Sequence, residues 1–258
     1  MGKANTSWGN VAKWYDTLLE GSEGTFQNDV ILPNLLRLLD VKPGQKLIDV
    51  ACGQGFFARH FADQGADVTG VDVSTELIAL ATAHEKKQKR KQGSLKFVVA
   101  PAHDMTTIKT ASADVATIIL AIQNIAEVHA TLNECARILT RAGRLVIVMN
   151  HPAFRVPKAS SWGWDEVAGI EYRRIEAYLS EAKIKIDMHP GEKNRTHTIT
   201  FHRPLQFYVK ALGKAGFGVT HLEEWISNRP GPKGRKFAAT EKARKEIPLF
   251  LCIEAKKI

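Results

Sequence analysis

A glycine-rich turn follows an apolar run in the first third of the chain. The run from Lys46 to Ala51 is typical of a buried parallel strand, and it leads into Gly53 and Gly55. Glycines let the backbone approach a ligand closely, and the helix expected next presents free N–H groups. Asp72 lies 19 positions beyond Gly53, at the end of the next strand-like run. A carboxylate there can accept hydrogen bonds from both hydroxyls of a ribose, so the spacing predicts a nucleoside site.

The type of nucleoside depends on Asp49. A nicotinamide dinucleotide would also fit, because Gly53, Gly55 and Ala58 match a loose form of its fingerprint. Asp49, near the end of the buried strand, would contribute nothing to a pyrophosphate site, whereas a ligand with an ammonium and a sulfonium could use its charge. We therefore expect the cofactor S-adenosyl-L-methionine.

Alternating strand-like and helix-like segments surround these residues. Strands are expected at 46–51, 67–71, 95–99, 114–120 and 144–149, and helices at 30–39, 56–64, 75–90 and around 128–139. This order predicts an α/β fold with a Rossmann-like, doubly wound, mostly parallel seven-stranded sheet. The last two strands, at 218–227 and 248–255, have no clear crossover helix between them, so they are expected to form an antiparallel C-terminal strand pair.

Residues 151–203 interrupt the alternation. A structureless stretch of this length is unusual inside a compact domain, so we interpret it as an inserted cap in a single domain spanning 1–258. We expect a helix near 166–180 and a hairpin between Ile184 and Phe201. The insertion starts at the carboxyl edge of the sheet, where ligands bind in such folds. Its aromatic residues would form either an acceptor pocket or a small satellite core; the pocket candidates are Trp162, Trp164 and Tyr172.

The segment LIDVACGQGFFARHFADQGADVTGVDVSTELIALAT, from Leu47 to Thr82, resembles the class I S-adenosylmethionine-dependent methyltransferases of the methyltransferase-11/25 type. That group includes quinone-biosynthesis enzymes. The segment LAIQNIAEVHATLNECARILTRAGRLVIV, residues 120–148, resembles later motifs of the group. The resemblance covers residues 10–150 and implies the fold, the cofactor and the reaction, but not the methyl acceptor.

The resemblance also implies cofactor-binding residues. Those expected at the methionine end are Asp49, Cys52, Gly53, Gly55, Ala121 and Gln123. Asp72 and Val73 would hold the ribose and the adenine edge, and Tyr15 would fold over the cofactor. Ala51 stands where many relatives carry glycine, and we expect it to have an ordinary φ. Pro101 stands where the group usually has an acidic residue against the adenine amino group, so His103, Asp104 or the backbone alone would take that role.

Methyl transfer is an in-line displacement on a sulfonium carbon, so the enzyme mainly aligns the acceptor and excludes water. A general base is needed only if the acceptor atom carries a proton. The candidates are His129, His151, His197 and His202. We favour His151 because it follows the fifth strand at its carboxyl end; the alternative is a loop histidine without a catalytic role.

The formal net charge of +9 raises the question of a nucleic-acid partner. The basic runs at 86–91 and 229–245 are not interleaved with aromatic residues that could stack on bases. The motif Asp/Asn-Pro-Pro-aromatic of amino-base methyltransferases is replaced by Ala121-Ile122-Gln123-Asn124. Neither Cys135 nor Cys252 follows a proline, as a cytosine C5 nucleophile would. We therefore expect a small-molecule acceptor and no specific nucleic acid.

Two other functions stay open from the sequence: an RNA or protein methyltransferase, and a cofactor-binding regulatory subunit without catalysis. Three unevenly spaced cysteines indicate neither a disulfide framework nor a metal site. No window is apolar enough for a membrane span, and the N-terminus lacks the apolar region of a signal peptide, so we expect a cytoplasmic protein. The sequence does not indicate an oligomeric state.

Overall fold

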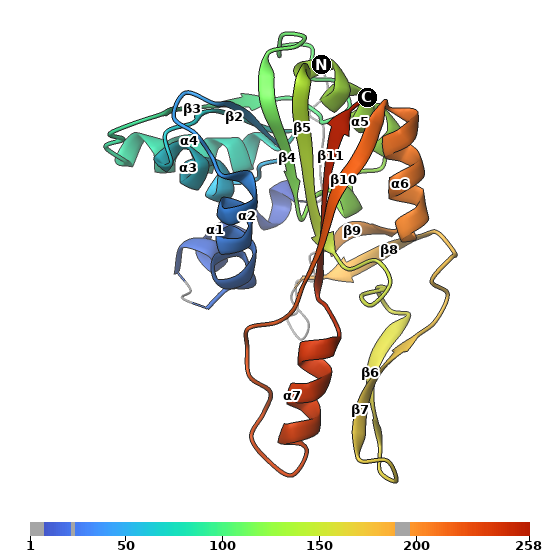
Figure 1. Cartoon of the computed structure of the whole chain (residues 1–258). Coiled ribbons are helices and arrows are strands. Elements are labelled where there is room, and N and C mark those ends of the chain that lie inside the picture. Colours follow the sequence, from blue (N-terminus) through green and yellow to red (C-terminus); the bar gives the residue numbers. More distant parts are fainter. Residues whose placement is uncertain (1–7, 22–23, 189–196) are drawn as a thin grey trace.

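The computed structural model describes residues 8–21, 24–188 and 197–258 (Figure 1). Its centre is a seven-stranded sheet with the order β10-β11-β5-β4-β1-β2-β3. The strands are β1 (Lys46–Val50), β2 (Asp67–Asp72), β3 (Ser94–Val99), β4 (Ala113–Ile119), β5 (Leu139–Asn150), β10 (Phe217–Trp225) and β11 (Phe250–Lys257). The pairings among β1 to β5 are parallel, and β11 pairs antiparallel with both β5 and β10. The predicted doubly wound sheet with its antiparallel C-terminal pair is confirmed.

Helices cover both faces of this sheet. The α-helices of the described residues are α1 (Ala12–Gly21), α2 (Leu32–Leu39), α3 (Phe56–Asp63), α4 (Thr75–Lys87), α5 (Val128–Ile138), α6 (Leu205–Lys214) and, away from the sheet, α7 (Phe237–Glu246). Side chains of successive residues in β5 enter two different cores, because strand side chains alternate between faces. Leu145 and Ile147 pack with α5 and α6, whereas Val146 and Val148 pack with α2 and α3. No helix in the described part of the chain is long and apolar enough to cross a membrane.

The insertion after β5 forms two hairpins. The first pairs β6 (Ser160–Asp165) with β7 (Ile170–Ile175), and the second pairs β8 (Ala182–Asp187) with β9 (His197–His202). The second hairpin was predicted between Ile184 and Phe201, although residues 189–196 lie outside the described ranges. The predicted helix near 166–180 is wrong. Exposure alternates residue by residue along β7, as in a strand with one face covered.

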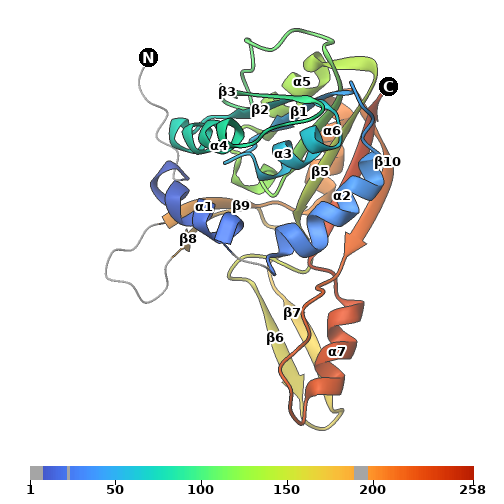
Figure 2. The same cartoon turned by 90° about the vertical axis from the view of Figure 1, so that its left-hand side faces the viewer.

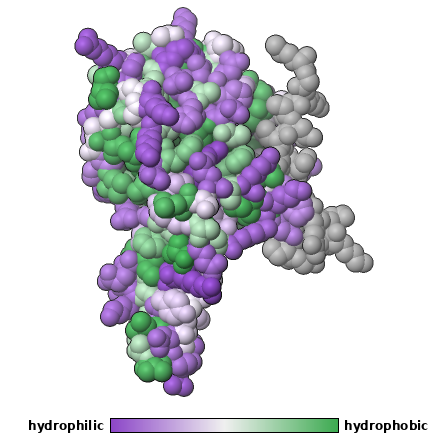
Figure 3. Space-filling model, turned by 90° about the vertical axis from the view of Figure 1, so that its right-hand side faces the viewer, coloured by the Kyte–Doolittle hydropathy of each residue, from purple (hydrophilic) through white to green (hydrophobic). Residues whose placement is uncertain are grey.

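The β6–β7 hairpin and α7 together form an arm that projects away from the sheet (Figures 1 and 2). The two pieces are distant in sequence but in contact: the Lys236 ammonium lies 4.4 Å from the centre of the Trp164 ring and 3.5 Å from the Glu166 carboxylate. The expectation of no clear helix between the last two strands is therefore also corrected, because α7 occupies that connection. In the view of Figure 3, hydrophobic patches on the arm are interrupted by hydrophilic residues.

Candidate cofactor and acceptor site

The turn between β1 and α3 is built from left-handed backbone. Ala51, Gly53 and Gly55 have φ values of 56°, 59° and 79°. A Cβ atom at Gly55 would lie 2.6 Å from the Phe97 ring, so that position needs glycine for space as well as for conformation. Our expectation of an ordinary φ at Ala51 is wrong: this residue adopts a conformation that costs an L-residue about 1–2 kcal/mol. Such local strain is typical of functional turns.

Asp72 links the end of β2 to this turn. Its Oδ2 accepts a hydrogen bond from the Gly53 N–H at 2.9 Å, and its Oδ1 accepts one from the Ser74 N–H at 2.8 Å. Burial raises the pKa of Asp72, and the backbone hydrogen bonds oppose that rise. A carboxylate has about four lone-pair sites. A third backbone hydrogen bond comes from Val73, so Asp72 keeps acceptor capacity for a ribose hydroxyl beside the turn.

Asp49 is almost fully buried in β1, with 1% of its surface exposed. Its Oδ1 accepts a hydrogen bond from the Thr117 hydroxyl at 2.7 Å, while Oδ2 has no hydrogen-bond partner among the described residues. Burial raises the pKa of Asp49 to about 7, although the Thr117 bond opposes the rise. A buried carboxylate oxygen without a donor is costly unless a ligand supplies a positive group. The ammonium and sulfonium of S-adenosylmethionine meet this requirement.

A cavity of about 360 Å³ lies above these residues at the carboxyl ends of the strands. Its size suits a small-molecule site. The cofactor-site candidates that line it are Tyr15, Asp49, Ala51, Cys52, Gly53, Asp72, Val73 and Ala121. Burial raises the pKa of Tyr15 to about 12 and that of the Cys52 thiol well above its usual range, so both side chains stay protonated near neutral pH.

Other lining residues escaped the sequence analysis. They come from the segment before α1, from α1 itself, from α3 and α4, from the loop after β4 and from the β8–β9 hairpin; among them are Trp8, Leu19, Phe56, Phe57, Leu77, Leu120, Asn124, Ile125, Ala126, Lys183, Ile199 and Phe201. The strict alternation of side chains in the predicted second hairpin was a usable signal, because it places Ile199 and Phe201 on one face.

Several candidate residues do not line the cavity. Gly55 packs under the turn, and the Gln123 side chain is hydrogen-bonded to the backbone N–H and C=O of Asn150. His103 and Asp104 are exposed in the loop after β3. The three aromatic pocket candidates, Trp162, Trp164 and Tyr172, lie on the β6–β7 hairpin in the arm.

His151 is buried but does not line the cavity. Its Nε2 lies 2.7 Å from Oε1 of Glu224, and its Nδ1 accepts backbone hydrogen bonds from Ala153 at 3.2 Å and Phe154 at 3.4 Å. Burial lowers the pKa of His151, and Glu224 opposes that shift. With both ring nitrogens engaged, His151 is placed to anchor the chain where it leaves β5.

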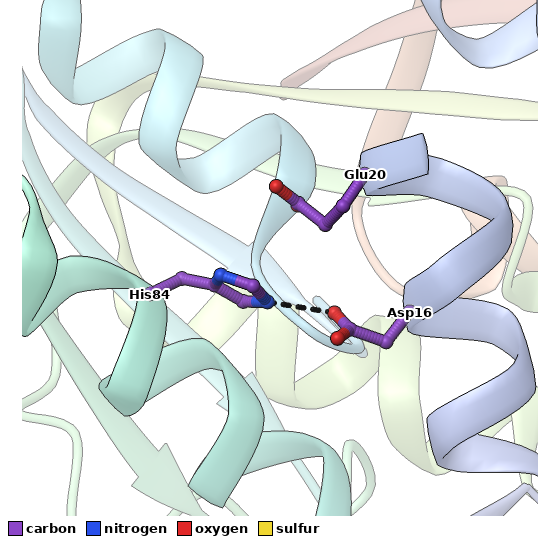
Figure 4. A group of neighbouring side chains, drawn as sticks. All are labelled: Asp16, Glu20 and His84. Carbon is purple, nitrogen blue, oxygen red and sulfur yellow. Dashed lines mark hydrogen bonds and ion pairs between the residues drawn. The ribbon is translucent and has the colours of Figure 1, made fainter. Parts of the chain in front are cut away.

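Helix α1 covers the cofactor end of the cavity and is fixed by polar contacts (Figure 4). Asp16 pairs with His84 of α4 at 2.7 Å, and Glu20 pairs with the buried Arg59 of α3. The ligand atoms of Asp16, Glu20 and His84 lie within 4.8 Å of one another, a spacing that could suit a metal ion. Arg59 already supplies a cation to Glu20, so the arrangement is explained as a clamp on α1.

The fold and this site define a Rossmann-like domain with a cavity whose residues suit S-adenosylmethionine. Residues 48–147 match the family model described as "Methyltransferase domain". The chain is 35% identical over 115 residues to demethylmenaquinone methyltransferase of Paenarthrobacter aurescens, covering 44% of this chain and 42% of the relative. It is 30% identical over 104 residues to ubiquinone biosynthesis O-methyltransferase of Psychrobacter cryohalolentis, covering 40% of each. The matches thus span about two fifths of these relatives.

Solved structures share the fold over most of the chain. An S-adenosylmethionine dependent methyltransferase from Mesorhizobium loti superposes with a TM-score of 0.69 at 24% identity, covering 90% of this chain and 100% of that one. A SAM dependent methyltransferase from Aquifex aeolicus gives a TM-score of 0.61 at 14% identity, covering 97% and 98%. Both likenesses extend past residues 48–147.

Proposed function

We propose that this chain transfers a methyl group from S-adenosylmethionine to a small-molecule acceptor. The observation that carries this proposal is the composition of the cavity. It holds two buried carboxylates near the glycine turn and continues between the loop after β4 and the β8–β9 hairpin. One continuous cavity therefore offers a cofactor end and an acceptor end next to each other, which alignment for in-line transfer requires.

The chain's residues have separate tasks in this scheme. Asp72 holds the ribose, and Asp49 compensates the positive charge of the methionine part. Trp8 and Tyr15, whose rings meet edge to face at 5.4 Å between centroids, cover the cofactor and keep water out. The bound cofactor supplies an electrophilic methyl group. The apolar lining at the acceptor end, including Ile199 and Phe201, holds the acceptor in line.

The names of the relatives support a small acceptor of quinone type. One relative is named for a different acceptor: 23S rRNA (uracil(1939)-C(5))-methyltransferase from Thiobacillus denitrificans is 38% identical over 85 residues, which cover 19% of its length. RNA is therefore one of the acceptors tested in the assay described below. Cys52, which lies in the cavity, is held as a neutral thiol by burial and is poorly suited to act as the nucleophile of C5 chemistry.

The proposal is tested in two steps. Calorimetry with S-adenosylhomocysteine should give a Kd in the micromolar range or below, about −8 kcal/mol or better. Asp72→Ala should weaken this binding by about 1.5–3 kcal/mol, the range of charged hydrogen bonds. Glu246→Ala, an equal charge change at the end of α7, should leave it unchanged. Binding of NADH in place of the adenosyl ligand would contradict the cofactor assignment.

The second step identifies the acceptor. The protein is incubated with S-adenosylmethionine labelled in its methyl group, together with quinol precursors, other small extracts or total RNA. We expect label in the small-molecule fraction. Label in RNA at ~150 mM salt, with a preference for one sequence, would replace the small acceptor by RNA.

A further inference from the structure

We propose that the acceptor is a flat molecule with an anionic group, and that Lys183 of the β8–β9 hairpin binds this group. The inference rests on the proposed function and specifies its acceptor. It arises from the position of one cation in a cavity whose other charged lining residues are both acidic.

The hairpin presents three residues to the cavity from one face. Lys183 is directly opposite Phe201 in the antiparallel register, and Ile199 is two positions from Phe201 on the same strand. Side chains at such positions point to the same side of the sheet. The Thr200 hydroxyl donates to the Gln123 carbonyl at 3.3 Å, which ties the hairpin to the loop after β4. The three side chains thus have a fixed place at the acceptor end.

The charges in the cavity are segregated. The charged groups among the described lining residues are Asp49 and Asp72 at the glycine turn and Lys183 at the hairpin. Within the described ranges, the Lys183 ammonium has no carboxylate within ion-pair distance; the residue is exposed, and its ammonium lies 6.0 Å from the centre of the Phe201 ring. When an apolar acceptor fills the space and excludes water, an ammonium at its edge is stabilised if the acceptor brings a negative charge.

The neighbouring cation Arg203 is not a candidate for this role, because it does not line the cavity and is already paired with Glu181 at 3.9 Å. Its guanidinium donates to the carbonyls of Ile125 and Ala126 at 3.1 and 3.0 Å and lies 4.7 Å from the centre of the Phe201 ring. Arg203 is therefore a positioning residue that fixes the walls at Ile125, Ala126 and Phe201. Lys183 remains as the lining cation that a ligand can reach, beside an aromatic ring suited to a flat partner.

Two carboxylates could meet Lys183: that of the acceptor and that of the methionine part of the cofactor. We assign Lys183 to the acceptor because its neighbours Ile199 and Phe201 form apolar walls, whereas the carboxylates and the glycine turn that suit the cofactor belong to the other end. If Lys183 binds the acceptor, its substitution should leave the cofactor affinity unchanged. If it binds the cofactor carboxylate, the substitution should weaken cofactor binding.

The test uses 2-naphthoate and its neutral analogue 2-naphthamide as probes, titrated with and without saturating S-adenosylhomocysteine. We expect the wild-type protein to bind naphthoate at least tenfold more tightly than naphthamide. Lys183→Ala should abolish this preference, and Lys183→Arg should retain it. The matched control Lys185→Ala removes a charge from the same strand at a position outside the lining and should behave as wild type.

Three outcomes would overturn the proposal: equal binding of the two probes, loss of the preference in Lys185→Ala as well, or a tenfold loss of S-adenosylhomocysteine affinity in Lys183→Ala. The last outcome would give Lys183 to the cofactor carboxylate. Failure of the wild-type protein to bind S-adenosylhomocysteine would refute the proposed function instead, and the probe titration without cofactor would still report on Lys183.

Discussion

Replacing Asp49 by Asn should stabilise the ligand-free protein at neutral and alkaline pH. Burial raises the pKa of Asp49 from 3.8 to about 7, so the unfolded chain releases this proton at lower pH than the folded chain. Below about pH 4 the Asp49 carboxyl is neutral in both the folded and the unfolded state, so the free energy of unfolding is unaffected. As the pH rises from about 4 to about 7, the unfolded state gains stability by losing this proton, and the free energy of unfolding falls. At 1.36 kcal/mol per pKa unit, this loss amounts to about 4 kcal/mol. Asn has no such proton, so the variant avoids the loss.

The assay is urea unfolding of both proteins at pH 4, 5, 6, 7 and 8, followed by tryptophan fluorescence and circular dichroism. The free energy of unfolding of Asp49→Asn minus that of wild type should increase by about 4 kcal/mol from the lowest to the highest pH. Glu246→Gln, which removes an exposed charge, provides the control. Parallel pH profiles for wild type and Asp49→Asn would refute the reasoning, because they would mean that Asp49 is not a buried, proton-linked carboxyl.

The affinity for the cofactor should rise with pH, whereas the stability of the ligand-free wild-type protein falls. A cationic ligand prefers ionised Asp49, so the affinity of wild type for S-adenosylmethionine should rise with pH up to about 7 and level off above it. Asp49→Asn should bind more weakly at pH 8 and lose this pH dependence. Calorimetry at the same pH values measures both effects.

Three further substitutions test other parts of the structure. Gly55→Ala should lower the free energy of unfolding, measured in urea, by about 2–4 kcal/mol, because the new Cβ would meet an aromatic ring at a residue with left-handed backbone. The control Gly169→Ala also has a positive φ but open space, and it should lower the free energy of unfolding by about 1 kcal/mol. His151→Ala should lower the free energy of unfolding by about 1–3 kcal/mol and change kcat by less than about threefold, because both ring nitrogens make structural hydrogen bonds. A kcat about a hundredfold lower would instead indicate that His151 acts as the general base. Trp164→Ala should leave the acceptor KM unchanged and Phe201→Ala should raise it; the reverse would return the acceptor site to the arm.

The sheet was predictable because its signals are local. Short apolar runs, Gly turns and the Ser74 cap, which accepts from the Leu77 N–H at 3.2 Å, each follow from neighbouring residues. The segment of β7 was mistaken for a helix because a short apolar pattern fits either element when the partner strand is unknown. Helix α7 escaped prediction since its sequence is strongly polar and its contacts are to a distant hairpin.

The candidate site divides in the same way. Gly53 and Asp72 are two ends of one β-α-β unit, so their spacing indicates their contact. Lys183 and Phe201 reach the cavity only through the fold of an insertion, and no local pattern shows which cavity they face. The content of aromatic residues in 151–203 indicated a pocket but not its position, because Trp162 and Tyr172 belong to the hairpin that leaves the sheet.

The arm has a consequence for folding order. Its β6–β7 hairpin follows β5, while α7 is inserted between the final two strands of the sheet. The elements β8, β9, α6 and β10 lie between the two pieces in sequence, so the arm depends on contacts between remote segments. We expect it to form late and to open locally before the rest of the domain. Amide hydrogens of β7 should therefore exchange faster than those of β4, and limited proteolysis should first cut residues 226–236, which join β10 to α7 without regular structure.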